Sequence, residues 1–213
     1  MKLYHGSKLI VSHPLNAGSK SNNDYGAAFY LTRDLESAHE WACRNNTIGI
    51  VNVYDFDIKG LNVLDLTNKE KYTVLNWLAI LLHFRTLETN FAKAFNTRLK
   101  YIEDHYFIDV SKYDLVIGYR ADDAYFRFPL DFIRGNLTLE QLEYSFNLGK
   151  LGIQYVITSQ KGIDKLKFIK SLPSEEKYIN QYFSSVTRAS KAFDMLNKDE
   201  EGTRVFDITR KEK

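Results

Sequence analysis

The chain has 213 residues, of which 44% are hydrophobic and 26% are charged, and these shares are ordinary for a soluble globular protein. The formal net charge of +2 is too small to argue by itself for a nucleic-acid or membrane partner. The single cysteine, Cys43, excludes an intramolecular disulfide and a cysteine-based metal site, and it fits a reducing compartment.

The N-terminal segment predicts a strand followed by a polar loop. Residues 2–5 form the predicted strand, which leads into Gly6 and Ser7. The stretch 16–24 is polar and rich in turn-forming residues, which predicts a mobile loop. A loop in this place is either a solvated connector or a clasp or lid over a pocket, and both interpretations stay open.

The next predicted strand and helix are the segment around which a pocket can form. Residues 26–28 are glycine and two alanines, so a ligand can approach the backbone closely there. Thr32 or Asp34 can cap the helix that follows. Tyr30 on the strand and Trp41 on the last turn of the helix can then form the walls of a slot for a flat ring.

The rest of the chain alternates predicted strands and helices. The longest apolar run, 78–82, is far too short to span a bilayer, and no apolar signal region precedes the first strand, so we expect a cytoplasmic protein without a membrane partner. Pro173 closes the compact part. We therefore expect one domain over 1–172 and a C-terminal helical extension over 173–213, whose charged end is frayed. The predicted strands cover 48–58, 60–66, 113–120, 151–158 and 166–169. The predicted helices cover 71–84, 91–106, 174–196 and a short segment opened by a Thr138–Gln141 capping box.

Two adjacent carboxylates, Asp122 and Asp123, follow an apolar strand that ends at Arg120. Such a pair can cap the next segment, contact a substrate or coordinate a cation. No third carboxylate or histidine lies nearby in the sequence, which makes the pair a poor metal site. Capping is the default interpretation, and we expect no metal.

Three segments, in this order and spacing, resemble the ADP-ribosyltransferase superfamily. They are Tyr4-His5-Gly6-Ser7, the stretch 25–32 with Trp41 eleven residues after Tyr30, and Ile153-Gln154-Tyr155-Val156. They look like the His-Tyr-Glu branch, which includes diphtheria toxin and the poly(ADP-ribose) polymerases. The chain as a whole, with its Ala121-Asp122-Asp123 motif, is similar to a bacterial family assigned to this superfamily. The resemblance covers about residues 2–170 and implies a split, two-sheet α+β fold with helical insertions around 70–108 and 175–197.

The resemblance implies a role for each matching residue. His5 matches the histidine that hydrogen-bonds the ribose next to nicotinamide, and Gly6 matches the residue whose backbone contacts the nicotinamide amide. Ser7 matches a hydroxyl residue that helps to seat the amide or the ribose. Tyr30 matches the first aromatic residue of the branch, and Trp41 stands where a second tyrosine stacks on the nicotinamide ring.

Two positions depart from the branch. Ala38 stands where the polymerases have a serine that bonds the carboxamide, so this contact is not carried over. Gln154 stands at the catalytic glutamate, and an amide keeps the hydrogen bond to the ribose 2′-hydroxyl but loses the negative charge that stabilises an oxocarbenium-like transition state. Another acid can replace that charge, with Asp114, Asp122 and Asp123 as candidates. Otherwise the enzyme is slow, relies on a nucleophilic acceptor, or binds NAD without turnover.

The function that the resemblance implies is transfer of ADP-ribose from NAD to a macromolecular acceptor, with release of nicotinamide. By analogy, a small enzyme of this kind is the toxin of a bacterial toxin–antitoxin or phage-defence system, with an antitoxin protein as partner. An inactive NAD- or ADP-ribose-binding module, an NAD hydrolase and a nucleic-acid-binding protein stay open as alternatives. His5, Tyr30 and Trp41 also fit an ordinary core or surface, but an amide in mid-strand at Gln154 needs several hydrogen-bond partners, which favours a pocket.

Overall fold

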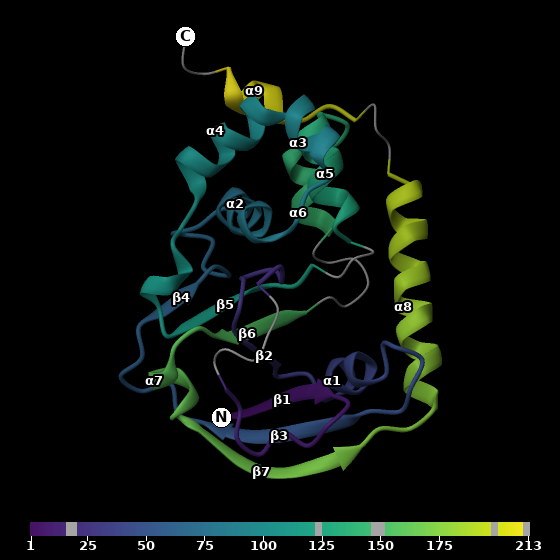
Figure 1. Cartoon of the computed structure of the whole chain (residues 1–213). Helices are drawn as coiled ribbons and strands as arrows, with labels where there is room; N and C mark the ends of the chain where they lie inside the picture. The colour runs from purple at the N-terminus through teal and green to yellow at the C-terminus, as the bar shows by residue number, and fades with distance from the viewer. Residues whose placement is uncertain (16–20, 122–124, 146–151, 197–199, 211–213) are drawn as a thin grey trace.

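The computed structural model describes residues 1–15, 21–121, 125–145, 152–196 and 200–210, which form a mixed α and β protein as predicted (Figure 1). The strands form one sheet in the order β4-β5-β6-β2-β1-β3-β7, in which only β4 and β5 run parallel. The strands are β1 (Lys2–Ser7), β2 (Phe29–Thr32), β3 (Ile50–Phe56), β4 (Val63–Asp65), β5 (Leu115–Tyr119), β6 (Ile153–Ile157) and β7 (Leu166–Pro173). The helices are α1 (Leu35–Ala42), α2 (Val74–Phe84), α3 (Thr89–Ala94), α4 (Asn96–Tyr106), α5 (Arg127–Arg134), α6 (Leu139–Ser145), α7 (Gln160–Ile163), α8 (Lys177–Asp194) and α9 (Val205–Thr209), with a short 3₁₀ turn at Val110–Lys112.

The strands form one continuous sheet, whereas the family resemblance implies a split, two-sheet fold. The halves β4-β5-β6-β2 and β1-β3-β7 are joined because Tyr4 of β1 pairs with Thr32 of β2, and this is the one register pair between the two strands. Beyond that pair the ladder stops. The carbonyl of Tyr30 then bonds the side chain of His5, with 2.8 Å between Nδ1 and the oxygen. The centre of the sheet is therefore joined at one point and open beside it.

Two apolar clusters cover the two faces of the sheet. On β5 and β6, alternate side chains point to opposite faces, so Val116 and Val156 belong to one cluster while Leu115 and Ile157 belong to the other. The larger cluster is formed with the helices that gather over the β4–β5–β6 end of the molecule (Figure 1). Trp77 of α2 is buried in this cluster. These helices place the end of α2 next to the open part of the sheet.

The C-terminal segment packs against the rest of the chain, so the frayed charged end predicted from the sequence is wrong for residues 200–210. Val205 and Ile208 of α9 are buried in the larger apolar cluster, together with Phe193 of α8. Their spacing of three residues puts both side chains on one face of the short helix. At its other end α8 lies on α1, where the ring of Tyr178 stacks on His39 with 4.4 Å between the centroids.

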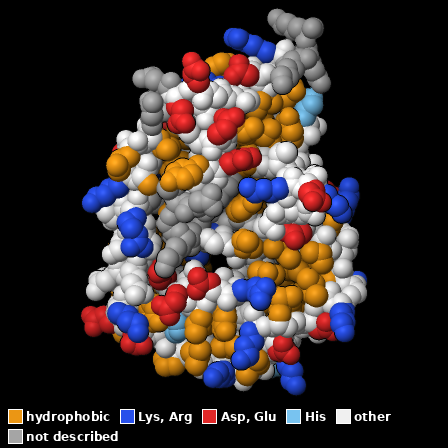
Figure 2. All heavy atoms as spheres, turned by 180° about the vertical axis from the view of Figure 1, so that it is seen from behind, with side chains coloured by type: hydrophobic (Ala, Val, Ile, Leu, Met, Phe, Trp, Pro, Cys, Tyr) orange, Lys and Arg blue, Asp and Glu red, His pale blue; other side chains and the backbone are white. Residues whose placement is uncertain are grey.

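The described surface seen in Figure 2 carries charged and hydrophobic side chains of every kind side by side. On the face shown in Figure 2, basic and acidic side chains are interspersed, so the described residues of this face form no continuous basic surface of the kind that follows a nucleic-acid backbone. None of the described helices combines the length and the apolar composition needed to cross a bilayer.

Candidate functional site

A cleft of about 610 Å³ opens where β1 and β2 diverge. Its volume lies within the usual range for ligand and cofactor sites. Its walls come from β1, β2 and α1, from the adjacent ends of β5 and β6, from the end of α2, from residues 22–24 and from α8. Six residues that the sequence assigns to the site line it: His5, Gly6, Tyr30, Ala38, Trp41 and Gln154.

His5 stands at the point where the two strands separate. The Tyr30 carbonyl can only accept, so the hydrogen bond places the proton on Nδ1 and leaves Nε2 as the acceptor nitrogen. Burial lowers the pKa of His5; the bond to the Tyr30 carbonyl opposes this change, and the positive charge of Arg44 adds to it. The imidazole is therefore neutral near pH 7 and offers an acceptor to a hydroxyl group in the cleft.

Helix α1 lies directly on β1, which brings its first turns to the cleft. The Asp34 carboxylate caps the helix by accepting from the backbone N–H groups of Glu36 and Ser37, at 2.9 and 3.3 Å. A Cβ atom on Gly6 would lie 2.2 Å from the carbonyl oxygen of Ala38, so only glycine fits under the helix. The small residues predicted at Gly6 and Ala38 thus have a packing role, and they leave room beside Trp41.

The indole of Trp41 is covered by two guanidinium groups. The Cζ atoms of Arg44 and Arg120 lie 4.0 and 3.9 Å from the centroid of the ring. Two such groups are too wide to lie side by side on one face at these distances, so they occupy opposite faces. A flat cationic ligand can reach this indole when one guanidinium group moves aside, because both types of group favour an aromatic face.

Among the described residues that line the cleft, positive charges outnumber negative ones. Arg44, Arg85 and Arg120 line it, and among the described lining residues Asp24 alone is anionic. Guanidinium groups bind phosphate oxygens with paired, charge-assisted hydrogen bonds. The cleft is therefore suited to an anionic ligand that also carries a flat ring.

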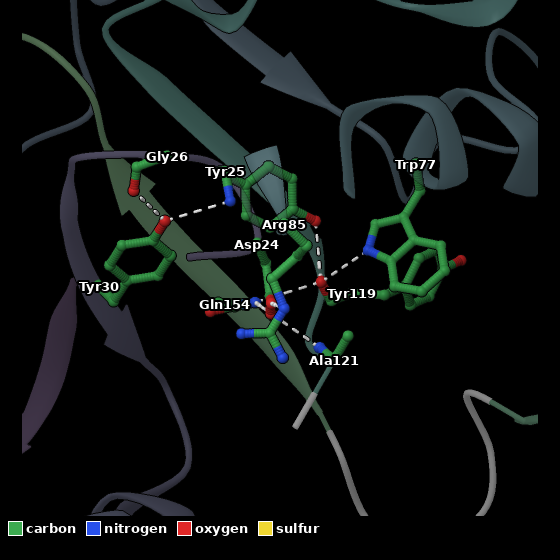
Figure 3. Close-up of polar contacts among 9 residues, drawn as sticks. All are labelled: Asp24, Tyr25, Gly26, Tyr30, Trp77, Arg85, Tyr119, Ala121 and Gln154. Atoms are coloured by element: carbon green, nitrogen blue, oxygen red, sulfur yellow. Dashed lines mark hydrogen bonds and ion pairs between the residues drawn. The ribbon is translucent and has the colours of Figure 1, made fainter. Parts of the chain in front are cut away.

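Gln154 lies at the base of the cleft with its amide fixed by hydrogen bonds (Figure 3). Its Nε2 donates to Oδ2 of Asp24 at 2.9 Å and to the carbonyl of Tyr119 at 3.3 Å. Both acceptors require a donor, so the amide nitrogen faces them and Oε1 faces elsewhere. None of the described residues donates to Oε1, which leaves this oxygen for a ligand.

Sequence reasoning missed the charged residues of the site, which are Asp24 and the three arginines. Only 8% of the surface of Asp24 is exposed, and its Oδ2 also accepts from the backbone N–H of Ala121 at 2.8 Å. Its Oδ1 lies 3.8 Å from Nε of Arg85. The sequence places Asp24 in the polar loop 16–24, of which residues 16–20 lie outside the described part of the chain. Its position as the last polar residue before an apolar strand was the available signal.

Tyr25 and Tyr30 hold the turn that carries Asp24 (Figure 3). The hydroxyl of Tyr30 accepts from the backbone N–H of Tyr25 at 3.1 Å and donates to the carbonyl of Gly26 at 2.6 Å. The hydroxyl of Tyr25 donates to the carbonyl of Tyr119 at 2.8 Å. Burial raises the pKa of both phenols, so they stay protonated and keep donating.

Two predicted residues that the structure describes, Ser7 and Asp114, do not join this cluster. Ser7 does not line the cleft, because its hydroxyl bonds the carbonyl of Leu9. Asp114 caps the other end of β5, where the backbone N–H of residue 62 and neighbouring hydrogen-bond donors lower its pKa to about 2. Asp122 and Asp123 lie outside the described residues. Within the described part of the chain, no group of three His, Cys, Asp or Glu residues is arranged to hold a metal ion.

The comparison with known proteins gives a family. No curated protein and no solved structure matches the chain. A family model described as a protein of unknown function (DUF3990) matches residues 1–168. This match includes the described residues that line the cleft, except Tyr182 of α8. Because the matched part is well over half of the sequence, the chain belongs to the DUF3990 family.

Proposed function

We propose that this protein transfers ADP-ribose from NAD⁺ to a macromolecular acceptor and releases nicotinamide. The observation that carries the proposal is that His5, Tyr30, Trp41 and Gln154, from four different elements, line one cleft. The single register pair between β1 and β2 supports the finer assignment to a split ADP-ribosyltransferase fold, since the cleft opens where the two halves of the sheet separate.

The basic and aromatic groups of the cleft suit the two ends of NAD⁺. The diphosphate would attract the guanidinium groups of Arg44 and Arg120, which now lie on the Trp41 indole. An arginine that moves to a phosphate frees a face of the indole for the cationic pyridinium ring. The exchange replaces one cation–π contact of about 1–2 kcal/mol by another, so it needs little energy apart from the phosphate contacts.

The groups at the base of the cleft suit the ribose. Nε2 of His5 and Oε1 of Gln154 are acceptors, and each can receive a hydrogen bond from a ribose hydroxyl. In the reaction, the bond between ribose and nicotinamide breaks and its electron pair leaves with nicotinamide. An acceptor atom then bonds to the same ribose carbon and gives up a proton. Fixed acceptors beside the ribose stabilise the positive charge that develops there.

The test is to incubate the protein with labelled NAD⁺ and cell lysate, and to measure nicotinamide release and the polymer class that carries the label. We expect labelling by the wild type and its loss in His5→Ala and Trp41→Ala. His83→Ala is a matched control, because His83 bonds Glu103 and does not line the cleft. Unchanged labelling in both site variants would refute the proposal. Free ADP-ribose without an acceptor would indicate a hydrolase, and tight NAD⁺ binding without turnover would indicate a binding module.

A further inference from the structure

Gln154 lacks the negative charge that a glutamate at its position would supply, and the Asp24 carboxylate accepts a hydrogen bond from its amide (Figure 3). Among the described residues, the carboxylate of Asp24 contacts the Gln154 amide, the backbone N–H of Ala121 and the Arg85 side chain. A buried charge is very unfavourable unless such partners surround it. The contacts around Asp24 therefore form a site built to hold a negative charge at the base of the cleft.

The turn around Asp24 is fixed from two sides. The Tyr30 hydroxyl bonds the backbone on either side of the peptide between Tyr25 and Gly26, and the Tyr25 hydroxyl bonds the end of β5. Gly26 has a φ of 77° and is packed against Phe84, where a Cβ atom would lie 2.7 Å from the ring. This support leaves Asp24 little freedom to move away from Gln154, as an effective electrostatic group requires.

The contact with Asp24 determines what Gln154 presents to a ligand. It uses one hydrogen of the amide nitrogen, and the Tyr119 carbonyl uses the other, so the amide cannot rotate without losing both bonds. The oxygen Oε1 is thereby held as an acceptor. A hydrogen bond from an amide to an anion also increases the negative charge on the amide oxygen, because bonded dipoles polarise one another at low dielectric.

We infer that Asp24 is a positioning residue for the transfer reaction: it fixes the Gln154 amide with Oε1 toward the ribose and supplies the negative charge that Gln154 lacks. This inference rests on the proposed function. The pair Asp24–Gln154 would then divide between two residues what one glutamate provides, with the hydrogen-bond acceptor on Gln154 and the charge on Asp24.

The test measures nicotinamide release, NAD⁺ affinity and melting temperature for the full chain and three variants. Asp24→Asn keeps the shape and removes the charge, and we expect kcat to fall about 10²-fold while the Kd for NAD⁺ changes less than threefold. Asp131→Asn is the matched control: Asp131 is also buried, at 7% exposure, and bonds Arg134 at 2.7 Å without lining the cleft. We expect wild-type kcat in this control.

The double variant Asp24→Asn with Gln154→Glu exchanges the two groups: the carboxylate is now at position 154 and the amide at position 24. We expect its kcat to be at least tenfold higher than that of Asp24→Asn, which a purely structural role of Asp24 would not produce. Wild-type kcat in Asp24→Asn, or a double variant no better than that single variant, would overturn the inference while leaving the proposed function standing. A wild type that neither binds NAD⁺ nor releases nicotinamide would overturn both.

Discussion

The substitution Gln154→Glu, which puts a carboxylate in place of the amide, should destabilise this protein in a pH-dependent way. It replaces the amide nitrogen by an oxygen at a position 2.9 Å from the Asp24 carboxylate. Two full charges at that separation repel by about 6 kcal/mol at an effective dielectric constant of 20. Such a pair instead keeps one proton, because protonation is the less costly alternative near neutral pH.

The size of the effect follows from the proton that the folded variant keeps. A glutamate with its ordinary pKa of about 4.3 is ionised in the unfolded chain, so holding its proton in the folded state costs about 1 kcal/mol at pH 5 and about 4 kcal/mol at pH 7. The sign is that of a carboxyl whose folded-state pKa is raised: stability is retained below the unfolded pKa and is lost as the pH rises. Arg85, 3.8 Å from the other Asp24 oxygen, reduces the repulsion, so these values are upper limits.

The assay is thermal unfolding of the wild type and of Gln154→Glu between pH 5 and pH 7. At pH 7 we expect the variant to melt about 8–16 °C lower, and at pH 5 only about 2–4 °C lower. Gln141→Glu is the control, since the Gln141 amide also donates to a carboxylate, that of Glu200 at 2.8 Å, but Glu200 is exposed and can turn toward solvent. A difference between wild type and Gln154→Glu that does not depend on pH would refute an ionised Asp24 beside residue 154.

Three further changes test the surroundings of the cleft. Gly6→Ala puts a Cβ atom 2.2 Å from the Ala38 carbonyl oxygen, where ordinary contacts begin at 3.4 Å, so α1 must move by about 1 Å. We expect urea unfolding to show a free energy of unfolding lower by about 1–3 kcal/mol, and calorimetry to show weaker NAD⁺ binding. Arg120→Ala removes one cation from the proposed diphosphate site, and we expect calorimetry to show about tenfold weaker binding of NAD⁺. Binding of nicotinamide alone should not weaken, because the same change uncovers the Trp41 indole. Burial lowers the pKa of His39 below its value in the unfolded chain, so the unfolded state takes up the proton first as the pH falls. The melting temperature should therefore fall as the pH drops through about 6.5. His39→Gln should show a smaller fall, and an equal fall would exclude His39 as the cause.

The fold was predictable where the sequence carries local signals. The predicted capping box is present, because Thr138 and Gln141 exchange backbone-to-side-chain bonds of 3.0 and 3.1 Å. The predicted helix over 91–106 is instead α3 and α4, divided at Phe95, which has a φ of −114°. Helix α9 was not predicted, since two apolar residues among charged ones give no pattern until the core they enter is known. Tertiary packing decided both differences.

The aromatic walls of the cleft, Tyr30 and Trp41, were predicted from the strand and helix that carry them, and His5 was added by the family resemblance. The ionic groups of the cleft were not predicted. Asp24 and Gln154 are 130 positions apart in the sequence, and no local pattern relates them. They meet because β6 lies beside β2 and the turn before β2 folds back toward the end of β5. Besides the position of Asp24 before an apolar strand, the amide itself was a usable signal: a buried Gln154 must find partners, although the sequence did not say which.

The cleft and the join in the sheet have one structural cause. Antiparallel pairing from Tyr4 and Thr32 onward would place Gly6 opposite Tyr30 and close the opening with backbone hydrogen bonds. The imidazole of His5 takes the Tyr30 carbonyl instead, so this acceptor is satisfied while the strands stay apart. Gly6 is then free to lie under α1, which brings Trp41 to the same opening. The histidine that faces the proposed ribose thus also keeps the site open, and a substitution at His5 should alter the shape of the cleft as well as its chemistry.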